Sequence, residues 1–175
     1  EDVVYKTLEY IEEIDSDKIV PLSDELAIRY TDAGHILLSK QCEVYINGGS
    51  RTRKILFSSD LGNISTQDTR VFVENFKPVT SANIAIMECT YASKKRQCTK
   101  ETYKKDVTKI KSVVEQYCID NNSRVLIPSF SLDRTPYILW ILYSLFGKDE
   151  NFKIPILIDS PLANRLLDCY SSILD

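Results

Sequence analysis

Apolar and polar residues alternate in short runs through the first half of the chain, as the two faces of a β-strand require. These runs predict strands over residues 26–30, 42–46, 54–58 and 84–87. The Asn-Gly-Gly-Ser segment at 47–50 predicts a hairpin turn, because glycine adopts positive φ at no steric cost. Apolar residues recur at helical spacing before the first strand and predict an amphipathic helix over residues 2–13.

The second half has a different pattern, in which segments with apolar residues at helical spacing alternate with short continuous apolar runs. Helical spacing predicts helices over residues 99–119, 134–146 and 162–174. The runs at 124–127 and 154–158 predict strands. Alternation of this kind favours a parallel sheet with helices on both faces. The helix at 134–146 is apolar nearly all round, so we expect most of it to be buried.

Composition narrows the class of protein without identifying it. The 175 residues carry a net charge of −3, with 43% hydrophobic and 27% charged residues, which is ordinary for a globular protein. No apolar run approaches the ~20 residues that span a bilayer, so we expect no membrane contact. The five cysteines show no C-x-x-C spacing, which favours reduced thiols and a cytoplasmic protein, or a nuclear one in a eukaryote.

Three residues with metal-binding chemistry each follow a short apolar run. His35 is the only histidine of the chain, and Asp60 and Glu88 follow the third and fourth predicted strands. An imidazole and carboxylates are ligand types that zinc takes in proteins. Each of the three residues, considered alone, also has an ordinary structural interpretation. They could be a structural histidine, a turn aspartate and a glutamate at the surface end of a strand. Two roles are likewise open for Asp32. Its carboxylate could accept a hydrogen bond from His35, or it could be an ordinary turn residue.

Five blocks in order carry a specific resemblance. They read DAGHILLS (32–39), SSDLG (58–62), ECTYA (88–92), IPSFSLDRTP (127–136) and DSPLA (159–163). This series resembles the metallo-β-lactamase superfamily in its β-CASP branch of RNA-processing nucleases. The similarity covers nearly the whole chain.

The resemblance implies an α/β fold in two parts. Residues 1–92 would be part of the metallo-β-lactamase αββα sandwich, and residues 93–175 part of a Rossmann-like β-CASP domain. His35 and Asp60 would be metal ligands, Asp60 bridging two zinc ions. Glu88 would be a catalytic-site acid that orients a histidine near the metal.

Departures from the family pattern are equally informative. The family's H-x-H-x-D-H ligand cluster and its two later histidines are absent from the chain. Leu38, Ser59 and Ala92 stand where the family has glycine, and Pro136 stands where it usually has glutamine. We therefore expect an internal fragment of a longer enzyme that is inactive in isolation. The alternative is a relative that no longer catalyses.

A local basic segment provides candidate residues for contact with a nucleic-acid substrate. Residues 94–111 contain eight Lys or Arg against two acids in a chain of net negative charge. Lys94, Lys95 and Arg96 begin this segment and are candidate RNA phosphate contacts. Arg134, at the start of a predicted helix, is a further candidate. A solvated helix face for the lysines and a structural ion pair for Arg134 are the competing interpretations.

These observations predict part of a zinc-dependent ribonuclease that hydrolyses phosphodiester bonds of single-stranded RNA. The alternative is a non-catalytic subunit that binds RNA or a partner nuclease, and a homo-oligomer is open in either case. A lactamase-fold hydrolase of small thioesters is a weaker third interpretation, because the blocks after residue 88 resemble the RNA-processing branch.

Overall fold

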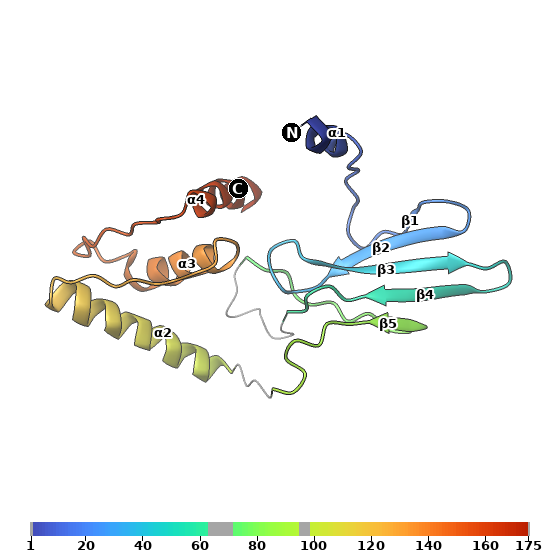
Figure 1. Ribbon diagram of the computed structural model, residues 1–175. Coiled ribbons are helices and arrows are strands. Elements are labelled where there is room, and N and C mark those ends of the chain that lie inside the picture. Colours follow the sequence, from blue (N-terminus) through green and yellow to red (C-terminus); the bar gives the residue numbers. More distant parts are fainter. Residues whose placement is uncertain (1, 63–71, 95–98, 175) are drawn as a thin grey trace. The chain divides into compact units, whose positions relative to one another are not determined.

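The chain is a mixed α/β protein that divides into two compact units, residues 1–94 and 95–175 (Figure 1). The computed structural model describes residues 2–62, 72–94 and 99–174. Among the helices of these described residues, none is long and apolar enough to cross a membrane.

A five-stranded sheet in the order β1-β2-β3-β4-β5 forms the first unit. Its strands are β1 (Val20–Pro21), β2 (Leu26–Asp32), β3 (Lys40–Asn47), β4 (Thr52–Phe57) and β5 (Ile84–Ile86). The first four are antiparallel to their neighbours, and β5 pairs with β4 in parallel. The predicted hairpin is confirmed: the Gly48 N–H donates to the Arg51 carbonyl at 3.0 Å, and Gly49 has φ of +74°.

The three central strands are tied together by a buried carboxylate. Glu43 on β3 is fully buried, and its oxygens accept hydrogen bonds from Arg29 on β2 and from Lys54 on β4 at 2.8–3.0 Å. The Tyr45 hydroxyl donates a further bond at 3.0 Å. A buried charge costs free energy unless it is paired, and this one has donors from both neighbouring strands.

The predicted N-terminal helix is shorter than the pattern indicated. Helix α1 covers Asp2–Leu8 rather than residues 2–13. Its apolar residues are exposed, as is Ile11 beyond its end. A short helix gains most of its stability by packing an apolar face, and this one has no packed face to extend along.

Helices dominate the second unit. They are α2 (Lys100–Val114), continued by the π-helical turn η1 (Glu115–Asp120), then α3 (Arg134–Phe146) and α4 (Pro161–Leu174). Thr99 and Thr102 form a capping box that begins α2. The core joins α2, η1 and α3 through Val114, Cys118, Leu142 and Phe146. Burial of α3 is less complete than predicted, because Tyr143 on its other face is mostly exposed.

The two strands predicted for the second unit do not form among its described residues. Residues 124–127 and 154–158 are extended, but no ladder joins them to each other or to another segment. The parallel sheet expected there is therefore wrong for this structure, and the one parallel pair described lies in the first unit. A strand needs a hydrogen-bonded neighbour, and the alternation of apolar runs cannot show whether one is present.

Candidate metal centre

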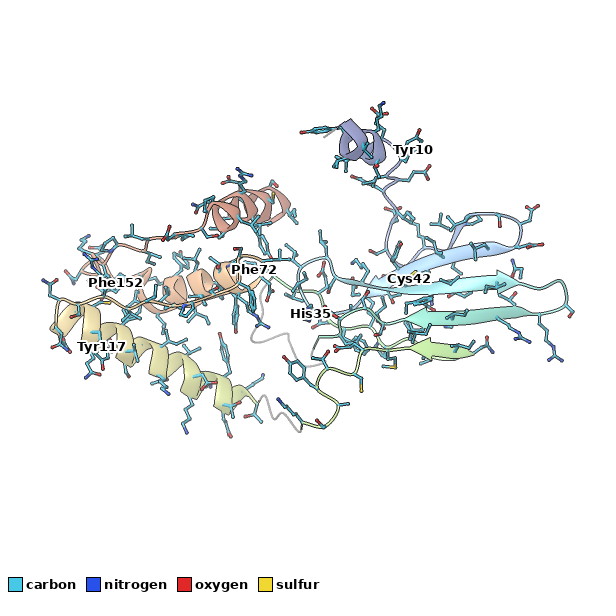
Figure 2. All side chains as sticks on the ribbon, in the orientation of Figure 1. Tyr10, His35, Cys42, Phe72, Tyr117 and Phe152 are labelled. Atoms are coloured by element: carbon cyan, nitrogen blue, oxygen red, sulfur yellow. The ribbon has the colours of Figure 1, made fainter. Side chains whose placement is uncertain are left out.

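His35 lies in the tight connection between β2 and β3 (Figure 2). Ser39 closes this turn: its hydroxyl accepts the N–H groups of His35 and Ile36 at 3.0 and 3.1 Å. Its carbonyl accepts the Ala33 N–H at 2.9 Å. Leu38 completes the turn at φ of +62°, a left-handed conformation that favours glycine. The backbone around the histidine is thus held by one serine.

Asp60 lies in a second turn that is fastened directly to the first. The Gly62 N–H donates to the Ala33 carbonyl at 2.9 Å. A Cβ atom on Gly62 would lie 1.5 Å from the Gly34 carbonyl oxygen, so only glycine permits this approach. Gly34 itself has φ of +68° and abuts Phe76. Two glycines therefore allow the His35 turn and the Asp60 turn to touch.

This contact brings an imidazole and a carboxylate together. The His35 Nε2 and Asp60 Oδ2 atoms lie 4.0 Å apart, and the two side chains are 37% and 76% exposed. One nitrogen and one oxygen donor at this separation, open to solvent, are compatible with two ligands of a zinc ion. Within the described part of the chain, no group of three or more His, Cys, Asp or Glu residues is placed to hold a metal. The pair supplies only part of a zinc coordination sphere.

Glu88 supports the Asp60 turn from the next segment. Its carboxylate accepts the Leu61 N–H at 2.9 Å and the Thr90 N–H at 3.3 Å. Its own N–H donates to the Ser58 hydroxyl at 3.1 Å. The bond from Leu61, followed by those from Thr90 and the smaller influence of His35, holds the pKa of Glu88 below its usual range. Glu88 therefore carries negative charge beside the histidine–aspartate pair at neutral pH.

Asp32 does not contact His35 in the structure. Its buried carboxylate pairs with Lys40 and with Lys77, the latter at 2.9 Å. Burial acts to raise the pKa of Asp32, but hydrogen bonds from the two lysines outweigh it and lower the pKa. The His35 N–H is bound by Ser39 instead. Asp32 thus secures the end of β2, and a supporting role toward the metal stays a prediction.

The candidate phosphate contacts are more dispersed. Lys94 is exposed, and its ammonium lies 5.9 Å from the centre of the Tyr91 ring. Lys95 and Arg96 lie outside the described residues. Arg134 belongs to the second unit, where its Nε lies 3.6 Å from the Asp133 carboxylate. The structure brings His35, Asp60 and Glu88 together, and a phosphate role for the basic residues stays a prediction.

Two serines in the centre were missed by reasoning from the sequence. Ser39 ends the first block and holds the His35 turn, and buried Ser58 begins the second and holds Glu88. A serine inside an apolar run, where a buried hydroxyl needs a partner, was the one available signal for Ser58. Ser39 follows the histidine too closely for a spacing argument to separate it from an ordinary turn residue.

The chain is similar in sequence to a bacterial ribonuclease and to a plant cleavage and polyadenylation specificity factor subunit. It is 29% identical over 145 residues to ribonuclease TTHA0252 of Thermus thermophilus, which covers 83% of the chain and 30% of that protein. It is 30% identical over 170 residues to cleavage and polyadenylation specificity factor subunit 3-I of Arabidopsis thaliana, covering 97% of the chain and 23% of that protein.

A third relative is an archaeal protein. Transcription termination factor FttA of Methanosarcina mazei is 22% identical over 157 residues, covering 90% of the chain and 23% of that protein. The chain thus spans less than a third of the length of each of these curated relatives. No family model matches it.

Proposed function

Because the chain belongs to the β-CASP RNA-processing branch of the metallo-β-lactamase superfamily, we propose that it is part of a zinc-dependent ribonuclease. The reaction would be hydrolysis of RNA phosphodiester bonds. The observation that carries this proposal is the approach of His35 and Asp60 to 4.0 Å at the joined turns. Residues 1–92 would belong to the sandwich domain and residues 93–175 to the Rossmann-like domain, and the division of the chain into units near residue 94 supports this boundary.

His35 and Asp60 are the residues that would hold zinc, and further ligands would come from outside these 175 residues. Zinc, when bound, would supply Lewis acidity and lower the pKa of water. Ser39 fixes the backbone of the His35 turn, and Gly62 keeps the Asp60 turn against it. This preorganisation lowers the cost of bringing the two ligands together when the ion binds.

Glu88 would act in two ways at this centre. Its carboxylate fixes the backbone that follows Asp60, through the Leu61 N–H. The family resemblance also assigns it the orientation of a histidine that this chain does not contain. Since each carboxylate oxygen has further acceptor capacity, the contact to Leu61 leaves room for such a bond. Ser58 would keep Glu88 in position through the Glu88 N–H.

The replaced family glycines weigh against the non-catalytic alternative. Leu38 and Ser59 both adopt left-handed backbone conformations, with φ of +62° and +52°. The two turns thus retain the conformation for which glycine is preferred, despite the larger side chains. Loss of these glycines therefore does not imply loss of the site. A non-catalytic subunit that binds RNA or a partner nuclease remains the second candidate, because the chain holds two ligands only.

Single-stranded RNA is the proposed substrate, with the basic segment that begins at Lys94 and Arg134 of the second unit as phosphate contacts. A homo-oligomer or a complex with a partner nuclease stays a prediction. A relative from Arabidopsis is named as a subunit of a cleavage factor, which makes a multi-subunit setting reasonable. The cytoplasm, or the nucleus in a eukaryote, is the proposed compartment.

RNA cleavage by the natural protein that contains this segment tests the proposal. With zinc supplied, we expect a labelled single-stranded RNA to be cut. Asp60→Asn should lower the cleavage rate at least about 100-fold, because loss of a residue that only supports a metal ligand already costs up to about 100-fold. Asp15→Asn, at an exposed ion pair, is the matched control and should leave the rate unchanged. RNA retained without cleavage would favour the binding subunit instead.

A further inference from the structure

The turn that contains His35 has one backbone group whose partner comes from a distant segment. The Leu38 N–H donates to the Glu74 carboxylate at 3.0 Å, although the two residues are 36 positions apart in the sequence. Within the turn, the Ser39 hydroxyl accepts the N–H groups of His35 and Ile36. Glu74 lies outside the five blocks that resemble the family, so the resemblance assigns it no role.

Leu38 is the residue of this turn that depends most on an external partner. Its φ of +62° is left-handed, a conformation that is costly for a residue with a side chain. Its side chain is 53% exposed, so packing does little to hold it there. A hydrogen bond to an ionised group is roughly twice as strong as one between neutral groups. The Glu74 carboxylate is therefore well suited to stabilise this backbone conformation.

The segment that carries Glu74 is itself fixed to the sheet. The Lys77 N–H donates to the Asp32 carbonyl at 3.0 Å, and the Lys77 ammonium pairs with the Asp32 carboxylate. The buried Gln41 amide donates to the carbonyls of Asp32 and Lys77 at 3.1 and 2.8 Å. Glu74 thus reaches the turn from a segment that is held to β2 and β3 only three residues further along.

Backbone contacts connect the Glu74 bond to the histidine. The Ser39 N–H donates to the Ile36 carbonyl at 3.0 Å, and its hydroxyl accepts the His35 N–H at 3.0 Å. A change of φ at Leu38 would redirect Ser39, which follows it, and break both bonds. We propose that Glu74 is a positioning residue for His35, because it holds Leu38 in the conformation that closes this turn. This role rests on the proposed zinc centre, where a ligand turn that is fixed before the ion binds loses less freedom on binding.

The identity of residue 38 explains why such a bond is needed. Leu38 stands where the family has glycine, which adopts a left-handed conformation without steric cost. A leucine at the same φ needs an acceptor that rewards the conformation. The effect of Glu74 should therefore depend on the residue at position 38. That dependence separates a positioning role from a general contribution to folding.

The test is amide-resolved hydrogen–deuterium exchange of the 175-residue chain without metal. Glu74→Ala removes the acceptor of the Leu38 amide, which should exchange at least about tenfold faster. The amides of His35 and Ile36 should also exchange faster, although their own acceptor, Ser39, is unchanged. Glu74→Gln keeps an acceptor oxygen and should restore slow exchange at all three. Amides of β4 should be unaffected, which shows that the first unit stays folded.

Two further variants give the matched comparisons. Glu25→Ala removes an exposed carboxylate just before β2 and should leave the exchange of the His35 turn unchanged. In a Leu38→Gly background, Glu74→Ala should accelerate the His35 and Ile36 amides less than about twofold, because glycine holds the conformation unaided. Acceleration confined to the Leu38 amide, or an equal effect in both backgrounds, would overturn the proposal.

Zinc affinity of the natural protein that contains this segment, measured by competition with a chelator, extends the test to the metal. Glu74→Ala should lower the affinity about tenfold, the lower end for loss of a group that supports a ligand, and Glu74→Gln should restore it. Zinc binding that is unchanged in Glu74→Ala would overturn the proposal. A natural protein that binds no zinc would instead reject the proposed function, and the exchange experiment would still decide whether Glu74 positions the His35 turn.

Discussion

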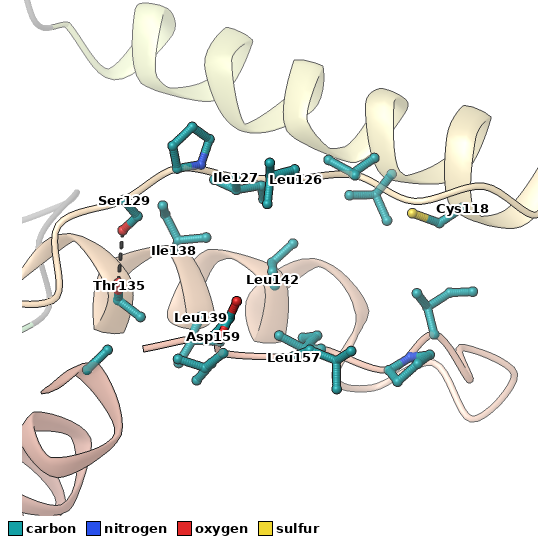
Figure 3. Close-up of a pocket in the computed structure, with 18 of the residues that line it drawn as sticks. Cys118, Leu126, Ile127, Ser129, Thr135, Ile138, Leu139, Leu142, Leu157 and Asp159 are labelled. Carbon is teal, nitrogen blue, oxygen red and sulfur yellow. Dashed lines mark hydrogen bonds between the residues drawn. The ribbon is translucent and has the colours of Figure 1, made fainter. Parts of the chain in front are cut away.

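Both units contain apolar segments that predict strands, but only the first unit pairs them in a sheet among its described residues. In the first unit, β2, β3 and β4 have partners on both sides and a carboxylate that joins all three. In the second unit, two aliphatic runs are extended beside helices (Figure 3), and no strand pairs with them among the residues that the structure describes. An apolar run thus predicts extended backbone, whereas a sheet also requires a neighbour within hydrogen-bonding distance.

The difference extends to what stabilises each unit. Charged and polar groups are buried in the first unit, where the buried carboxylates of Asp32 and Glu43 each have two cationic partners. The core of the second unit is aliphatic and aromatic, with the Phe146 and Phe152 rings stacked at 4.4 Å between centroids. Substitutions in the two units should therefore act through different physical terms.

The largest effect is expected in the core of the second unit. Phe146→Ala removes a ring that is 6% exposed and leaves a cavity, at a cost of about 3–5 kcal/mol in the free energy of unfolding. Phe130→Ala is the matched control, because that ring is 81% exposed, and should cost less than about 0.5 kcal/mol. Trp140, the only tryptophan, lies on α3, so its fluorescence during urea unfolding follows this unit. Equal losses for both variants would contradict the assigned core.

Next in size is removal of the buried carboxylate. Glu43→Ala leaves Arg29 and Lys54 without their shared partner and should cost the first unit about 3 kcal/mol. Hydrogen exchange of β3 amides measures this loss while Trp140 fluorescence reports the other unit. Asp15→Ala removes an exposed partner of Lys18 and should change stability by less than about 1 kcal/mol. A Glu43 variant as stable as the Asp15 variant would show that the network contributes little.

A pH dependence specific to the first unit follows from the same carboxyl groups. Burial acts to raise the pKa of Glu43, but hydrogen bonds from Arg29, Lys54 and Tyr45 outweigh it, so its pKa is lowered, as is that of Asp32. A lowered pKa gives stability that is complete above the unfolded value, about pH 4, and is lost as the pH falls through the folded value.

Hydrogen exchange of β3 amides at several pH values checks this expectation. Protection should fall below about pH 4, and Glu43→Gln should reduce the dependence on pH because the titrating group is gone. An unchanged slope in that variant would assign the acid sensitivity to other carboxyl groups.

The smallest expected effect is a gain in stability at the turns of the candidate centre. Leu38→Gly and Ser59→Gly relieve left-handed strain, with a net gain of about 1 kcal/mol each after the entropic cost of glycine. Leu22→Gly, at an exposed position without positive φ, should instead lose about 0.5–1 kcal/mol. Thermal unfolding compares the three, and losses in all of them would contradict strain at residues 38 and 59.

Much of the candidate centre could be predicted from the sequence because its residues lie in short blocks at strand ends. His35, Asp60 and Glu88 do lie near one another. The partners of Asp32 could not be predicted, since Lys77 lies far from it in the sequence and reaches it only in the folded chain. Ser58 was missed for the same reason. The strands of the second unit were wrong because pairing depends on a neighbour that an apolar run does not reveal.

The most direct test of this contrast is amide-resolved hydrogen exchange of the 175-residue chain alone. The account predicts strong protection in β2, β3 and β4, and rapid exchange of the amides of residues 125–127, 154 and 156–158 beside a protected α3. If those two segments were as strongly protected as β3 in the monomeric chain, they would already be paired, and this result would contradict the account.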